Sequence, residues 1–195
     1  DGNGTLDLGG TNTYTGATNI DDGELNVTGT LSDSTAVTVA SGATYDSDTT
    51  DTIGSIAGAG NIEINTATTL TVGGDDSSTT FSGVISEDGN LTKAGSGTLT
   101  LSGTNTNTGT TTISAGTLTL DQASNTTGTV IANTAAVTVN GGILNLADTT
   151  ETIGALTLTS GSITGTSKTL TGSSYTLNPG ADVSVSIAPI LAGSV

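Results

Sequence analysis

The chain has 195 residues and a formal net charge of −16, and its only basic residues are two lysines, Lys93 and Lys168. Such a charge repels phosphate backbones and anionic membranes, so we expect no nucleic-acid partner and no membrane insertion by this segment. The chain has no cysteine and no histidine. This composition excludes disulfides, thiolate metal sites and Ser-His or Cys-His nucleophiles.

Apolar residues alternate with polar ones in short pairs along the whole chain, which is the pattern of strands with one buried face. Hydrophobic residues make up only 32% of the chain, a level that would permit disorder, but their regular placement favours a folded protein. No long stretch has helical spacing, so we expect essentially no helix. In chain order the predicted strands are Leu6/Leu8, Leu25/Val27, Val37/Val39, Ile53/Ile56, Ile62/Ile64, Leu70/Val72, Val84/Ile85, Leu99/Leu101, Leu118/Leu120, Val137/Val139, Leu144/Leu146, Leu156/Leu158, Leu170, Tyr175/Leu177 and Val183/Val185/Ile187.

The phrase Gly-x-Leu-x-Leu occurs at Gly97–Leu101 and again at Gly116–Leu120. A strand of this length cannot bury itself, so its repetition predicts a stack of similar coils. We predict an all-β, single-stranded parallel β-helix (β-solenoid) of about 9–10 coils of about 20 residues. Leucines would point inward, and threonines such as Thr100 and Thr119 would point outward. Each opening glycine fits the bend into its strand.

The chain also contains two long internal copies. Gly4–Val27 superimposes on Gly97–Leu120 with a constant offset of 93, and the match resumes at an offset of 100 where Val37–Val39 meets Val137–Val139. The seven extra residues of the second copy fall around Gln122–Thr129, where a loop would absorb them. We therefore predict one continuous solenoid segment over residues 1–195, with internal copies at approximately 4–96 and 97–195.

The stretch LTKAGSGTLTLSGTNTNTGTTTISAGTLTL, Leu91–Leu120, resembles the autotransporter-associated β-strand repeat, also called the passenger-associated transport repeat. Thr52–Ile62, Leu70–Ser86 and Tyr175–Val195 look like connecting coils of the same family. The resemblance implies a right-handed β-helix in the passenger of a bacterial surface protein secreted by the type V route. It also implies that the sequence is an internal slice of a longer protein. Asn107 departs from the family pattern, because the family has an aromatic residue there, as at Tyr14.

Three groups of residues could be taken for chemical sites. Asp1–Asp7 imitates a calcium loop but lacks the closing glutamate, so we interpret it as a repeat turn. Asp46, Asp48 and Asp51 recur partly in the second copy as Asp148 and Glu151, with Leu146 in place of Asp46. They predict turns that bond their own backbone, with a weak surface cation site as the alternative. Asp21-Asp22, Asp75-Asp76 and Glu87-Asp88 are interpreted as solvated turn residues.

Catalysis is not expected, because the chain offers two lysines, few aromatic residues and no histidine, and because Lys93 belongs to the repeat motif. We predict no catalytic, cofactor-binding or metal-binding residue, and no cofactor. The sequence favours a non-enzymatic stalk or adhesin-like passenger segment at the bacterial cell surface or outside the cell. Its partners would be neighbouring repeats of the same chain, identical subunits end to end, or host or surface glycans.

Two alternatives stay open, a self-assembling filament subunit and a binding module for glycans or ice on a threonine-rich face. A constant coil length with a regular threonine ladder would favour ice. A groove with two carboxylates beside Tyr14, Tyr45 or Tyr175 would favour glycans. End-to-end pairing of identical chains would favour a filament.

Overall fold

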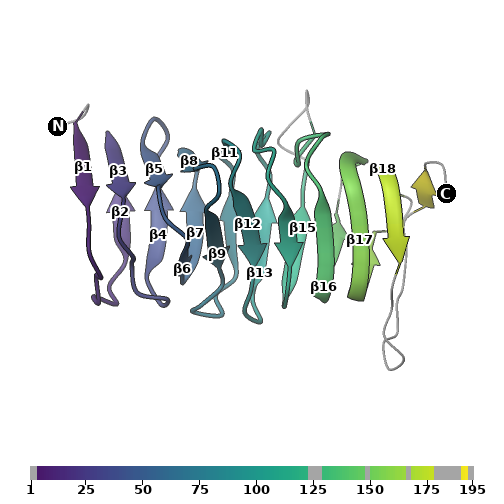
Figure 1. The fold of residues 1–195 in the computed structure, drawn as a ribbon, viewed down its shortest axis with the longest axis horizontal. Coiled ribbons are helices and arrows are strands. Elements are labelled where there is room, and N and C mark those ends of the chain that lie inside the picture. Colours follow the sequence, from purple (N-terminus) through teal and green to yellow (C-terminus); the bar gives the residue numbers. More distant parts are fainter. Residues whose placement is uncertain (1–3, 123–128, 148–149, 166–167, 178–189, 193–195) are drawn as a thin grey trace.

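The computed structural model describes residues 4–122, 129–147, 150–165, 168–177 and 190–192. Within these residues the protein is all-β with no helix, and its strands stack along one long axis from the N-terminal to the C-terminal end (Figure 1). The strands are β1 (Thr5–Leu8), β2 (Thr18–Ile20), β3 (Glu24–Val27), β4 (Ala36–Val39), β5 (Thr44–Ser47), β6 (Asp51–Ile53), β7 (Ser55–Gly58), β8 (Asn61–Ile64), β9 (Thr69–Val72), β10 (Thr79–Phe81), β11 (Val84–Ser86), β12 (Asn90–Lys93), β13 (Thr98–Leu101), β14 (Thr111–Ile113), β15 (Thr117–Leu120), β16 (Val137–Leu146), β17 (Glu151–Thr164), β18 (Thr169–Leu177) and β19 (Ile190–Ala192).

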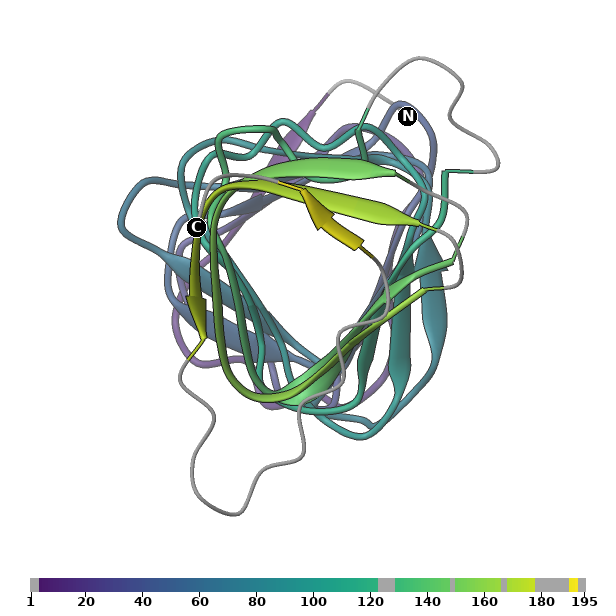
Figure 2. The same cartoon turned by 90° about the vertical axis from the view of Figure 1, so that its right-hand side faces the viewer.

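Each turn of the chain adds one rung to each of three faces, which enclose a common centre (Figure 2). Face A holds β1, β3, β5, β8 and β11, and it continues through Asn105, Val130 and the first residues of β17 and β18. Face B holds β2, β4, β7, β10, β13, β15 and the last residues of β16. Face C holds β6, β9, β12, β14 and the first residues of β16, followed by β17. All pairings between strands are parallel, so the predicted β-solenoid is confirmed.

Coil length is less regular than the predicted 20 residues. Thr44 pairs with Asn61, 17 residues later, whereas Thr111 pairs with Val137, 26 residues later. Despite the longer coil, Thr111–Ile113 pairs in parallel with Val137–Val139. In the second half, β16 runs continuously from face C to face B, pairing first with β14 and then with β15. Differences in coil length are therefore confined to the corners.

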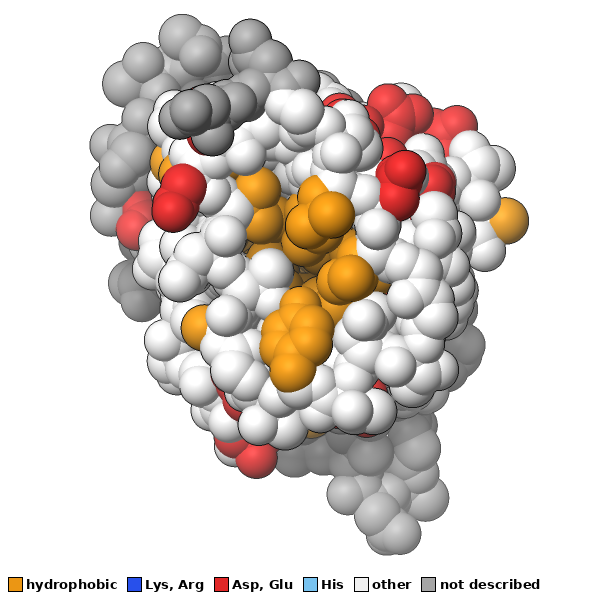
Figure 3. All heavy atoms as spheres, turned by 90° about the vertical axis from the view of Figure 1, so that its left-hand side faces the viewer, with side chains coloured by type: hydrophobic (Ala, Val, Ile, Leu, Met, Phe, Trp, Pro, Cys, Tyr) orange, Lys and Arg blue, Asp and Glu red, His pale blue; other side chains and the backbone are white. Residues whose placement is uncertain are grey.

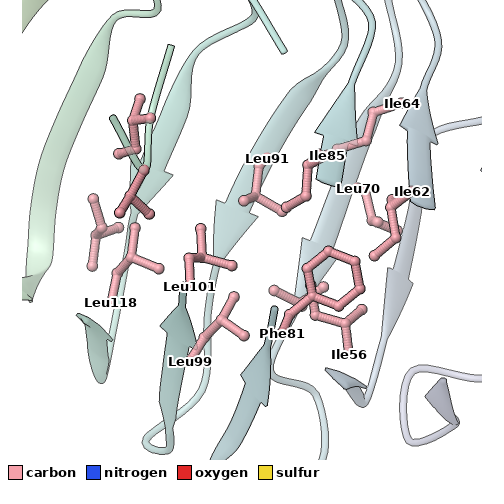
Figure 4. Close-up of a cluster of buried hydrophobic side chains, with 14 of the residues drawn as sticks. Ile56, Ile62, Ile64, Leu70, Phe81, Ile85, Leu91, Leu99, Leu101 and Leu118 are labelled. Atoms are coloured by element: carbon pink, nitrogen blue, oxygen red, sulfur yellow. The ribbon is translucent and has the colours of Figure 1, made fainter. Parts of the chain in front are cut away.

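The centre of the stack is filled by aliphatic side chains from all three faces. Hydrophobic side chains occupy the middle of the N-terminal end and acidic ones its periphery (Figure 3). Farther in, side chains from neighbouring strands point into the same interior and stack along the axis, among them Phe81, Leu99 and Leu118 (Figure 4). Full burial of one such leucine contributes about 1.5–3 kcal/mol. The predicted inward residues of β13 and β15 are buried, and Thr100 and Thr119 point outward as expected.

Two predicted strand residues are exposed instead, Leu6 in β1 and Leu177 at the end of β18. The predicted strand Val183/Val185/Ile187 lies outside the described residues. Gly116 has a φ of 60°, as a bend into β15 requires. Gly97 serves another purpose, since a Cβ atom there would lie 2.1 Å from the Ser77 carbonyl oxygen of the coil below.

Residues that correspond between the two internal copies lie on different faces. Leu6 and Leu8 belong to face A, whereas their equivalents Leu99 and Leu101 belong to face B. Likewise, Val37 lies on face B and Val137 on face C. The offset of 93 residues corresponds to about four and two-thirds turns of roughly 20 residues, so the second copy starts two faces further along the winding of the chain, which is one face back around the axis.

Candidate functional sites

Asn105, a polar residue of the second long copy, is only 3% exposed on face A. Its Oδ1 accepts a hydrogen bond from the Ile85 backbone N–H at 2.8 Å. Its Nδ2 donates to the Val130 carbonyl oxygen at 2.7 Å. Ile85 belongs to the coil before Asn105 and Val130 to the coil after it. The side chain therefore replaces strand pairing at a level of the stack where no regular strand forms.

The first copy holds the equivalent contact at Asn12, whose Nδ2 donates to the Thr30 carbonyl oxygen at 3.0 Å. A carboxylate closes the next coil in both copies. Asp51 accepts from the Leu31 N–H at 2.8 Å, and Glu151 accepts from the Val130 and Ile131 N–H groups at 3.1 and 2.6 Å. Sequence reasoning noticed the recurrence of Asp51 and Glu151 but missed Asn12 and Asn105. Their shared offset of 93 was the signal that could have revealed them.

The three acids singled out as a candidate cation site do not converge. Asp46 and Asp48 both accept from Nδ2 of Asn65, at 2.7 and 2.5 Å. Asp51 points inward instead, where it also accepts from the N–H of Thr52 at 2.9 Å. Burial raises the pKa of Asp51, and its backbone hydrogen bonds oppose that rise. This carboxylate thus bonds backbone in its own turn and in the preceding coil.

Face A carries a ladder of acidic and amide side chains on its outer surface. Asp7 pairs in register with Asn26, Asn26 with Asp46, and Asp46 with Glu63. Partial burial, and then the charges of Asp48, Glu63 and Glu24, raise the pKa of Asp46 to about 6, although the Asn65 hydrogen bond opposes them. Carboxylates one coil apart repel each other, and this repulsion makes protonation of the Asp46 side chain easier.

The remaining acids bond within their turns or to the next coil. Asp75 accepts from the N–H of Ser77 at 2.9 Å, as an Asx-turn does. Asp76 accepts from the N–H of Ser96 in the following coil at 2.6 Å, and this bond lowers the pKa of Asp76. Asp1 and Asn3 of the imitation calcium loop lie outside the described residues. Within the described part of the chain, no group of three or more acidic side chains is arranged to hold a metal ion.

Lys93, the last residue of β12, is only 2% exposed. Its ammonium group donates to the carbonyl oxygens of Ala94 and Gly95, the latter at 3.1 Å. It also lies next to the turn of the following coil, 2.9 Å from where a Cβ atom on Gly116 would be. Burial lowers the pKa of Lys93, while the charges of Asp76 and Asp75 raise it. Its contacts join a corner of one coil to the next.

Face C presents an unbroken outward ladder of threonines. Seven of them pair in register over successive coils, namely Thr52, Thr71, Thr92, Thr112, Thr138, Thr157 and Thr176. The ladder persists although coil length varies, since Thr112 still pairs with Thr138 across the longest coil. Of the two features expected of an ice-binding solenoid, the ladder is present and the constant coil length is not.

An open groove of about 560 Å³ crosses the first coils between Asn12, Asp33 and Asp51. It holds two carboxylates, but none of the three tyrosines lines it. A second hollow, of about 460 Å³ at the N-terminal end, does place Tyr14 beside Asp21, Asp22 and Glu24, so it has the features expected of a glycan groove. Tyr45 is buried in the core, and its hydroxyl has no hydrogen-bond partner. The Tyr175 hydroxyl accepts from the Gly172 N–H at 2.7 Å. A search of the described residues finds no helix suited to crossing a bilayer.

The family model of the passenger-associated-transport-repeat matches residues 1–27 and 91–120. The chain carries two passenger-associated-transport-repeats. Asn12 and Asn105 lie inside the two repeats at equivalent positions, so the bridging asparagine is a shared part of the repeat here. Lys93 lies inside the second repeat, where it supports the corner before β13.

Among curated proteins, the chain is similar to the Adhesin BmaC autotransporter of Brucella suis biovar 1 (strain 1330). The two are 41% identical over 135 residues, which cover 58% of this chain. The chain spans about 4% of the length of that relative. No solved structure matches the chain.

Proposed function

We propose that this chain is a non-enzymatic shaft segment in the passenger of an adhesin-like protein at the bacterial cell surface or secreted from the cell. The relative is named an adhesin and an autotransporter, and the two repeats belong to the passenger-associated type. The observation that carries the proposal is the use of the buried polar side chains. Asn105, Asp51 and Glu151 all bond backbone groups of neighbouring coils, which makes them parts of the architecture.

A shaft must hold its length in water, and the side chains suit that role. Each coil adds about 4.8 Å along the axis, so nine coils hold a neighbouring domain about 43 Å further out. Threonines on face C and acids on face A keep the outside hydrated. A trypsin-like protease would find few sites, because the chain has no arginine and Lys93 is buried.

The first experiment separates a shaft from a binding module. The purified chain is added in increasing amounts to host cells and to a glycan array, with the folded state checked by circular dichroism. A shaft shows no saturable binding. Saturable binding at micromolar concentrations, lost in a variant with Asp33→Asn and Ser34→Ala in the open groove, would overturn the shaft in favour of a binding module.

The second experiment measures reach. The chain is placed between a surface anchor and an epitope on bacteria, and the height of the epitope is measured by fluorescence interference. A chain with two tandem copies of residues 4–192 serves as the comparison. The shaft predicts a further increase of about 43 Å for the second copy. An unchanged height would show that the segment does not act as a rigid spacer.

A further inference from the structure

Asn140 is the one described asparagine that is followed by a glycine, Gly141. Every other described asparagine precedes a threonine, isoleucine, valine or leucine. Asn3 also precedes a glycine, but it lies outside the described residues. The backbone nitrogen that follows an asparagine can attack the side-chain amide carbon, and glycine obstructs this attack least because it has no side chain. Asn140 is therefore the described asparagine whose side chain is most open to attack by its own backbone.

The pair lies at the corner where β16 passes from face C to face B, and both residues are exposed. Gly141 has no register partner in the described strands β14, β15 and β17. The register between β16 and β17 shifts on both sides of Asn140. Gly141 has a φ of 116°, and a Cβ atom there would lie 2.6 Å from the Ser114 carbonyl oxygen. The fold therefore requires glycine at this position and leaves the corner outside the regular pairing.

A hydroxyl group of the following coil contacts the Asn140 amide. Oδ1 of Asn140 accepts a hydrogen bond from Oγ of Ser160 at 3.3 Å. This bond draws electrons away from the amide carbon and stabilises the negative charge that develops on Oδ1 when a nitrogen attacks. Oδ1 of Asn145 accepts a similar bond from Thr164 at 3.2 Å, but Leu146 follows Asn145. Only Asn140 thus combines the hydroxyl donor with a following glycine among the described residues.

We propose that Asn140 is a site of spontaneous modification, which converts it to aspartate and isoaspartate without an enzyme. The Gly141 nitrogen forms a bond to Cγ of Asn140, and the amide NH2 group leaves with the Gly141 proton as ammonia. The product is a five-membered succinimide ring. Solvent water then adds to one of the two ring carbonyl carbons. Breaking the Cγ–N bond gives aspartate, and breaking the other C–N bond gives isoaspartate, whose main chain runs through Cγ.

Either product changes the corner without requiring the stack to open. Each adds one negative charge next to Ser114, Ala115 and Gly161, which carry none. Aspartate keeps an oxygen that can accept from Ser160. Isoaspartate adds one carbon to the main chain at a point where the register is already shifted, so the pairing with β14 and β15 can persist. The modification is independent of an adhesive role, and it accumulates with the time that the chain spends in water.

The main test follows the purified, folded chain at physiological temperature over several weeks, at neutral and at mildly alkaline pH. Samples are digested with pepsin in acid and sequenced by mass spectrometry, and isoaspartate is labelled with an isoaspartyl methyltransferase. We expect conversion at Asn140 but not at Asn145, and a faster rate at the higher pH, because the Gly141 nitrogen attacks after losing its proton. The free peptide 137–146 is the reference. An unmodified Asn140 under conditions that convert the peptide would overturn the proposal.

The contribution of Ser160 is tested in the folded chain with Ser160→Ala, and Thr164→Ala is the matched control beside Asn145. Loss of one neutral hydrogen bond should slow conversion of Asn140 by about 2- to 5-fold, whereas Thr164→Ala should leave the rate unchanged. Asn140→Gln should abolish the modification, since its ring would need one more atom. An unchanged rate in Ser160→Ala would refute the assistance by Ser160. Equal conversion at Asn145 would refute the selectivity for Asn140.

Discussion

Replacing Asn105 with leucine is the sharpest test of how neighbouring coils are joined. Leucine matches asparagine in size but cannot bond to Ile85 or Val130. The Ile85 N–H would lose the Oδ1 acceptor at 2.8 Å, and an unsatisfied buried N–H costs about 1–3 kcal/mol. The Val130 carbonyl would lose Nδ2 but keep the Asn105 backbone N–H at 3.3 Å, so this loss costs about 0.5–1.5 kcal/mol. We expect Asn105→Leu to lower the free energy of unfolding by about 2–4 kcal/mol.

The assay is urea unfolding followed by circular dichroism, with hydrogen exchange of the Ile85 amide as a local readout. Asn12→Leu is the matched control, because Asn12 occupies the same position of the first repeat and makes only the bond to Thr30 on that side. Its cost should be about 0.5–1.5 kcal/mol. Equal losses in the two variants, or continued slow exchange at Ile85 in Asn105→Leu, would refute the idea that the side chain bridges three coils.

Three other outcomes can be measured in the same way. Tyr45→Phe removes a buried hydroxyl without a hydrogen-bond partner, so it should leave the free energy of unfolding unchanged or raise it by about 1 kcal/mol. Tyr175→Phe should lower the free energy of unfolding, because it removes the acceptor of the Gly172 N–H. Leu99→Asp places an unpaired charge in the core and should cost more than about 4 kcal/mol, so an unchanged Tm would contradict its inward position. Stability should fall as pH rises from about 4 to about 6, because the pKa of Asp46 is raised from 3.8 to about 6 and the folded state binds the proton more tightly; Asp46→Asn should flatten this slope, and an identical slope would count against the ladder.

Alternation of apolar and polar residues predicted most of the strands and their inward faces, but it missed six strands that lack an alternating pair of aliphatic residues, namely β2, β5, β10, β12, β14 and β19. Leu99, Leu101 and Leu118 are buried as expected, because period-2 alternation in a parallel stack leaves each side chain one choice of face. The same pattern could not tell which of three faces a strand joins. That depends on the summed length of the corners, and corner residues carry no periodic signal.

Polar positions were harder to predict, because residue type alone does not distinguish a solvated turn from a buried bridge. Asp51 and Asp48 look alike in sequence, yet Asp51 bonds the Leu31 N–H inside the stack and Asp48 bonds Asn65 on its surface. Lys93 was interpreted as structural only through its place in the motif. Lys93 is buried because alternate residues of β12 point inward and Lys93 is one of them. Val72 holds the equivalent position one coil earlier.

The one-face stagger between the copies has a consequence for how an array of them would meet its surroundings. A corner of the first copy and the equivalent corner of the second copy project from the rod in directions that differ by a third of a turn. If further copies kept the stagger, a fourth would restore the starting direction, so equivalent corners would follow a slow spiral around the rod. Equivalent corners would then face all three directions around such a rod. A surface that approached the rod would meet one of them at any rotation of the rod about its axis.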